Sequence, residues 1–134
     1  MALYGFSDRV SIPPWLRPER REVARLDGFD IRMCPLANIV PSPPDSVYGV
    51  LCDATQRELA RLYGYARDVL GGVYLPDSVT VETRDGRAEP ALCYIASEMA
   101  DHPPAADYAD RVVRAARSLG FPDRYVARLE SFRP

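Results

Sequence analysis

The feature that most constrains the fold is a tight-turn signal in the second half of the chain. Asp85-Gly86 lies between two runs rich in strand-forming residues, 73–83 and 88–96. An Asp-Gly pair readily adopts the positive φ angles of a two-residue hairpin turn, and alternation of apolar and polar residues on both sides is typical of paired strands. The pattern therefore predicts a β-hairpin here.

One face of the predicted hairpin carries Val79, Val81 and Thr83, which are spaced two residues apart. Two packing arrangements are possible for this apolar face. It pairs with a second copy of the chain to give a homodimer, or it packs beneath the C-terminal helices of its own chain.

A helix is predicted over residues 55–70, directly before the hairpin. Thr55 and Glu58 have the spacing of a capping box, in which each side chain satisfies a backbone N–H of the first helical turn. Gly71-Gly72 ends the helix. Asp68 lies where the helix gives way to the turn, so its carboxylate is either a base in a pocket or a solvated charge at a helix end.

The first part of the chain indicates short strands separated by proline-rich segments. Strands are predicted over residues 2–4, 29–33, 36–40 and 46–52. The three prolines at positions 41, 43 and 44 are expected to break the backbone between the last two strands.

The last part of the chain predicts two helices. The first covers residues 108–119 and stops at Gly120, and the second covers residues 122–132 with Tyr125, Val126 and Leu129 as its apolar stripe. Strands and helices do not alternate regularly, so we expect a mixed α+β domain rather than a doubly wound sheet. At 134 residues, one domain spanning 1–134 is expected.

Composition excludes several functional classes. A net charge of −2 argues against nonspecific nucleic-acid binding, which needs a basic surface. No apolar run is long enough to cross a bilayer, and no signal peptide is recognisable. We therefore expect a cytoplasmic protein that does not associate with a membrane. The chain contains no lysine, which excludes a lysine Schiff base and a phosphate-loop lysine.

Neither a metal site nor a histidine-dependent nucleophile is expected. Cys34, Cys52 and Cys93 are widely spaced in apolar segments and are interpreted as small buried side chains. His102 is the only histidine and lies in a loop sequence, without the spacing of a zinc site. The same fact argues against Ser-His-Asp and Cys-His catalysis.

Four passages in a fixed order resemble the gamma-glutamylcyclotransferase-like superfamily. Tyr4-Gly5-Phe6-Ser7 is similar to the family's N-terminal Tyr-Gly-Ser-Asn loop. Residues 23–29 and 47–51 are similar to its early strands, the second of which reads Val-Tyr-Gly-Val-Leu here. The helix, the hairpin, residues 92–95 and residues 115–122 then follow in the family's order.

The resemblance implies a small mixed β-barrel with packed helices and a cavity at one end. Family enzymes cleave a γ-glutamyl amide: the substrate's own α-amine attacks its γ-carbonyl and releases 5-oxoproline and an amine. The resemblance implies a small-molecule substrate and neither a cofactor nor a metal. Backbone N–H groups of the N-terminal loop would hold the substrate, as preorganised amides do in other sites.

The family's catalytic base is a glutamate at the turn between helix and hairpin, and two alignments place it differently. Anchored on Tyr74, the alignment puts Asp68 in or beside the glutamate position, with the helix longer by about one turn of 3.6 residues. Anchored on Gly64, it puts Tyr63 there, which is not a base at neutral pH. We take Asp68 as the base, because the first alignment keeps a carboxylate and the Gly-Gly turn.

The remaining site residues follow from the same resemblance. Tyr4, Gly5, Phe6 and Ser7 would supply loop donors and pocket wall, and Phe6 in place of serine predicts a tighter, more apolar pocket. Three tyrosines would line the substrate: Tyr63, Tyr74 and Tyr94. Two other readings stay open, namely a small-molecule binding protein that has lost the chemistry and a plain interaction module.

Overall fold

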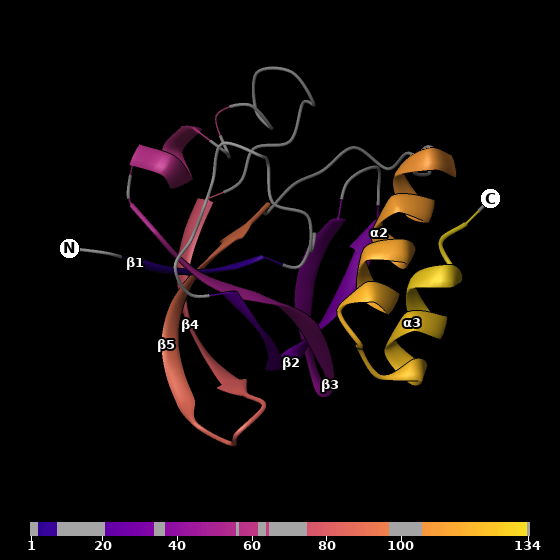
Figure 1. Ribbon diagram of the computed structural model, residues 1–134, viewed down its shortest axis with the longest axis horizontal. Helices are drawn as coiled ribbons and strands as arrows, with labels where there is room; N and C mark the ends of the chain where they lie inside the picture. The colour runs from indigo at the N-terminus through magenta and orange to yellow at the C-terminus, as the bar shows by residue number, and fades with distance from the viewer. Residues whose placement is uncertain are drawn as a thin grey trace.

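Two antiparallel ribbons form most of the sheet. The computed structural model describes residues 3–7, 21–33, 37–55, 57–61, 64, 75–96 and 106–133. Its strands are β1 (Leu3–Ser7), β2 (Arg21–Met33), β3 (Ala37–Ala54), β4 (Leu75–Thr83) and β5 (Ala88–Ile95), and its helices are α2 (Ala106–Ser118) and α3 (Asp123–Glu130). β2 pairs with β3, and β4 pairs with β5, while α2 and α3 lie side by side along one side of the sheet (Figure 1).

The pairings run in the order β1-β3-β2-β4-β5 and return from β5 to β1. Among the described residues, β2 meets β4 at two residue pairs and β1 meets β5 at two, so the two ribbons are joined over short stretches. The predicted α+β class is confirmed. The predicted barrel is realised only as a ring of strands with two short joints, rather than as a wall that is hydrogen-bonded throughout.

The predicted break at the three prolines is wrong. β3 continues from Ala37 to Ala54 and merges the two strands predicted over 36–40 and 46–52, and β2 begins at Arg21 instead of residue 29. The register shifts where Phe29 pairs with Pro41 but Asp27 pairs with Ser46. Residues 42–45 therefore form a bulge, in which the second and third prolines need no ladder N–H.

The bulge is held by local contacts. Gly28 on the opposite strand has a φ of +89°, which a residue with a Cβ adopts only with strain. The Ser46 hydroxyl donates to Asp27 Oδ1 at 2.6 Å, and the Ser42 hydroxyl donates to Asp45 Oδ2 at 2.5 Å. The prolines thus lie at a structured irregularity of a continuous ribbon.

The predicted hairpin is confirmed. Its turn closes through Gly86 N–H to Thr83 C=O at 3.0 Å and Thr83 N–H to Arg87 C=O at 2.9 Å, with a φ of +83° at Gly86. Val81 belongs to the hydrophobic core cluster and Val79 packs against it. This face of the hairpin is therefore covered from inside the molecule.

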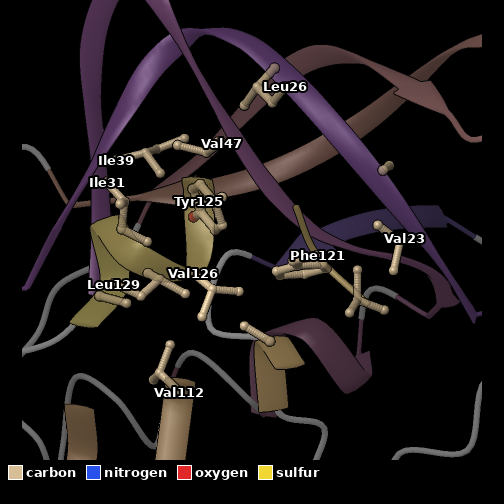
Figure 2. Packing of buried hydrophobic residues seen from close by; sticks show 14 of the residues in the cluster. Val23, Leu26, Ile31, Ile39, Val47, Val112, Phe121, Tyr125, Val126 and Leu129 are labelled. Atoms are coloured by element: carbon tan, nitrogen blue, oxygen red, sulfur yellow. The ribbon is translucent and has the colours of Figure 1, made fainter. Parts of the chain in front are cut away.

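The core lies between the sheet and the two C-terminal helices. Tyr125, Val126 and Leu129 of α3 lie among sheet residues that include Ile31 and Ile39, as Figure 2 shows. These three were the predicted apolar stripe, and all three are buried. The Arg84 guanidinium also donates to the Leu119 carbonyl at 2.7 Å, which ties the hairpin tip to the end of α2.

The helical residues after β3 begin as predicted. The Glu58 N–H donates to the Thr55 hydroxyl at 3.1 Å, and the Thr55 N–H donates to Glu58 Oε1 at 2.9 Å. This is the reciprocal pair of a capping box. Among the helices in the described part of the chain, none combines the length and apolar character needed to cross a membrane.

Candidate functional site

The backbone of β1 carries the first group of predicted site residues. Gly5 has Cys52 of β3 as its Cα partner on one side and Leu92 of β5 on the other, and Phe6 is paired with Cys93 of β5. The N-terminal segment 4–7 therefore lies between β3 and β5. This places its backbone next to the strand that carries Tyr94, as the predicted site requires.

Tyr94 is the one predicted tyrosine whose side chain the structure describes. It lies near the end of β5, one residue after the Phe6–Cys93 pair, and is half-buried. Burial raises the pKa of its phenol above the usual value. Tyr94 is therefore neutral at physiological pH, and its hydroxyl is able to donate and accept hydrogen bonds, which suits orientation of a polar substrate.

Asp68, Tyr63 and Tyr74 lie outside the described residues. The choice between Asp68 and Tyr63 for the family's glutamate position stays a prediction. What the structure brings together is the backbone of residues 4–7 with the end of β5.

Sequence reasoning missed the groups that β3 adds beside β1. Asp53 of β3 is the Cα partner of Tyr4. Burial, with the nearby Asp53 charge, raises the pKa of the Cys52 thiol to about 11. Cys52 is therefore protonated at neutral pH and is no nucleophile. Only the pairing of β1 with β3 reveals this neighbourhood, because the residues are far apart in sequence.

Two further sequence predictions concern metals and cysteines. Cys52 and Cys93 are buried, as expected, whereas Cys34 and His102 lie outside the described residues. Within the described ranges, no group of three or more His, Cys, Asp and Glu side chains is placed to hold a metal ion.

A separate groove of about 570 Å³ lies between β2, β3 and α3. The rings of Tyr48 and Tyr125, whose centroids are 5.4 Å apart, contribute to its wall. Two of the three arginines that line it are paired with acids: Arg25 lies 2.6 Å from Glu82, and Arg128 lies 2.9 Å from Asp30.

The carboxylate of Asp30, which lines the groove, has a lowered pKa. Burial alone would raise it, but the hydrogen bond and charge of Arg128, together with the Ile31 N–H and the Arg32 charge, hold the pKa of Asp30 below its usual value. A carboxylate with a lowered pKa is a poor proton acceptor near pH 7. Asp30 is therefore a poor candidate for the base that the predicted reaction needs.

Comparison with known proteins points to one family. The sequence profile of the AIG2-like family matches residues 46–129, more than half of the chain. The chain is 30% identical over 99 residues to a gamma-glutamylcyclotransferase of Bos taurus and 27% identical over 99 residues to that of Mus musculus. Each match covers 74% of this chain and 52% of the relative, so the matched part spans about half the length of these curated relatives.

Solved structures agree on the fold. A gamma-glutamyl cyclotransferase structure superposes with a TM-score of 0.80 at 23% identity, covering 100% of this chain and 89% of that chain. A yeast gamma-glutamyl cyclotransferase described as specific to glutathione superposes with a TM-score of 0.69 at 13% identity, covering 98% of this chain and 97% of that chain. At these identities the likeness concerns the fold alone.

Proposed function

Because this chain belongs to the AIG2-like family and to the gamma-glutamylcyclotransferase-like superfamily, we propose that it is a cyclotransferase acting on a γ-glutamyl or similar small molecule. The substrate's α-amine attacks its own γ-carbonyl carbon, the amide C–N bond breaks, and 5-oxoproline and a free amine leave. Both reacting groups belong to one molecule, so the protein's task is to fold the substrate and to move protons.

The observation that carries the proposal is the place of β1. Its backbone at Gly5 and Phe6 lies between β3 and β5, beside the half-buried Tyr94. In the proposed site, those backbone N–H groups of residues 4–7 that neither ladder uses stabilise the oxyanion that forms on the attacked carbonyl. Tyr94 and Tyr74 orient the substrate, and Tyr63 contributes to the pocket wall.

Asp68 is the proposed base. It takes a proton from the substrate's ammonium so that the neutral amine attacks, and the proton passes to the leaving amine. Aspartate is one methylene shorter than the family's glutamate, and a misplacement of about 1 Å costs on the order of 10²-fold in rate. We therefore propose a slow enzyme, whose substrate sits closer to the helix end than in a relative with glutamate.

The identity of Phe6 and Ser7 bears on the substrate. The family has serine and asparagine there, so in this chain a ring replaces one hydroxyl and the shorter hydroxyl of Ser7 replaces an amide. We propose a substrate whose leaving amine is apolar rather than a charged peptide. We also propose that residues 1–134 fold as one domain and that the protein acts in the cytoplasm.

A binding protein without chemistry is the second candidate. The alignment anchored on Gly64 favours it, because that alignment puts Tyr63 in the glutamate position, and a phenol with a pKa near 10 does not accept a proton at pH 7. In that case the pocket binds a γ-glutamyl compound and releases it unchanged.

The test is release of 5-oxoproline from a panel of γ-glutamyl amines with graded apolar amine parts. Asp68→Asn is expected to lower kcat by at least about 10²-fold, the scale of general base catalysis. Asp123→Asn, at an exposed acid that begins α3, is the matched control and should keep full activity. Undiminished release in Asp68→Asn removes Asp68 from the mechanism. Calorimetric binding of a panel member without any release favours the binding protein.

A further inference from the structure

Asn38 makes an uncommon link between β3 and the end of β5. Its side chain is only 8% exposed. Its amide nitrogen donates to the Ala96 carbonyl at 2.8 Å, and its amide oxygen accepts the Ala96 N–H at 3.0 Å. One side chain thus satisfies both backbone groups of one residue, as a neighbouring strand would.

This link comes where the ladder around β5 thins out. On the β1 side the pairing ends at Cys93. On the β4 side Tyr94 faces Pro76, which has no N–H to donate, and Ile95 faces the exposed Leu75. The two hydrogen bonds of Asn38 begin one residue later, so they fasten a strand end that has few other backbone partners among the described residues.

The neighbouring residue holds the next element. The Ala37 N–H donates to the Tyr108 hydroxyl at 2.7 Å, which anchors the first turns of α2 to the same end of β3. Two consecutive residues of β3 therefore bind what leaves β5 and what begins α2. Movement of β5 at this end would break bonds of a buried amide, which is costly because the amide would have no water to replace them.

We propose that Asn38 is a positioning residue: through Ala96 it fixes the end of β5 and thereby holds Tyr94 at the substrate pocket. The inference rests on the proposed function, in which Tyr94 orients the substrate. Asn38 itself touches neither substrate nor reacting atoms. Ala96 directly follows β5 and is two residues from Tyr94 on the same backbone, so a shift of Ala96 moves Tyr94 with it.

The variant that tests this is Asn38→Leu, which keeps the size of the side chain and removes both hydrogen bonds. Its matched control is Thr83→Val, a buried polar residue of the hairpin turn that is 3% exposed and has no bond to the end of β5. Both variants lose a buried hydrogen-bonding group, so both lose stability. Only Asn38→Leu is expected to loosen Tyr94. Asn38→Ser is the milder second variant if Asn38→Leu does not fold.

Three readouts separate positioning from plain stability. Amide hydrogen exchange at Tyr94 to Ala96 should rise by about tenfold or more over the same amides in Thr83→Val, because the opening is local. The kcat/KM for the best γ-glutamyl amine should fall about tenfold, mostly through KM, because Tyr94 binds ground state and transition state alike. In an NMR titration of labelled tyrosines, the pKa of Tyr94 should move down toward its ordinary value as the ring gains water.

The outcomes are distinct. Equal exchange, equal KM and an unchanged Tyr94 titration in Asn38→Leu and Thr83→Val overturn the proposal. If the unmodified protein releases no 5-oxoproline, the proposed function fails, but exchange and the Tyr94 titration still decide whether Asn38 positions Tyr94.

Discussion

Asp30 and Arg128 join β2 to α3, two elements that lie far apart in the sequence. Arg128 donates to both carboxylate oxygens of Asp30, at 2.9 and 3.3 Å, and to the Ile31 carbonyl at 3.3 Å. A two-pronged contact of this kind fixes direction as well as distance. It holds the apolar face of α3 over the strand residues that it buries.

This pair predicts a pH-dependent loss of stability. The pKa of Asp30 is lower in the folded chain, so its contribution is present above the unfolded pKa of about 4 and is lost as the pH falls through the folded value. Asp30→Asn should lower the free energy of unfolding by about 0.5–1 kcal/mol at pH 7, a modest cost because water screens the partly exposed Arg128. Urea unfolding at pH 7 and at pH 3 measures the difference, which should shrink at pH 3.

The control is Asp110→Asn. Asp110 pairs with Arg133 at 2.7 Å, but both side chains are more than one-third exposed. Its substitution should change stability less than Asp30→Asn does at pH 7. A cost for Asp30→Asn that grows toward acid pH would contradict the assigned direction of the shift.

At the scale of elements, the capping box decides how firmly the helical residues after β3 begin. Thr55→Ala should lower the free energy of unfolding by about 1 kcal/mol, because the Glu58 N–H loses its acceptor. Glu58→Gln keeps an oxygen that accepts the Thr55 N–H, so it should cost much less than Glu58→Ala. Thermal unfolding of the four proteins is the measurement, and equal costs for Glu58→Gln and Glu58→Ala would argue that the box contributes nothing.

Elements whose cause is local could be predicted from sequence. The hairpin turn at Asp85-Gly86 and the box between Thr55 and Glu58 depend on residues a few positions apart, and both formed as expected. The prediction of a break at the prolines after Val40 was wrong. Whether a proline breaks a strand depends on whether the partner strand needs an N–H at that position. The answer lies in β2, where Gly28 turns the backbone and leaves the bulge unpaired.

From the sequence, the candidate site could be predicted only where a short motif or a clear alternation of residues identifies one of its strands. The Tyr4-Gly5 motif identified β1, and β5 was recognised by its alternation. Their contact is a tertiary fact, and so is the approach of Asp53 to Tyr4. The base stays a prediction, because the sequence admits two alignments to the family, one that puts Asp68 and one that puts Tyr63 at the glutamate position.

At the scale of the whole molecule, stability depends on the layer between α3 and the sheet. Leu129 is 1% exposed in this layer, whereas Leu75 on β4 is 59% exposed. Leu129→Ala should lower the free energy of unfolding by about 2–5 kcal/mol, since it removes buried methyl groups and leaves a cavity. Leu75→Ala deletes the same atoms from a wet surface and should change it by less than about 0.5 kcal/mol.

Chemical denaturation of both leucine variants under one set of conditions tests this contrast. A large loss for Leu75→Ala would mean that Leu75 is covered in solution, as in a homodimer, and the loss should then depend on protein concentration.

The ring of strands has a consequence for the order of assembly. β2–β3 and β4–β5 join neighbours in sequence, whereas among the described residues β1 pairs with the distant β5 through Gly5–Leu92 and Phe6–Cys93. Contacts between such distant segments form late, because a long loop has to close first. During synthesis β1 emerges long before β5. One edge of β1 therefore stays unpaired with β5 until β5 has left the ribosome. The backbone that the proposed site depends on is thus completed by one of the last strands to be made.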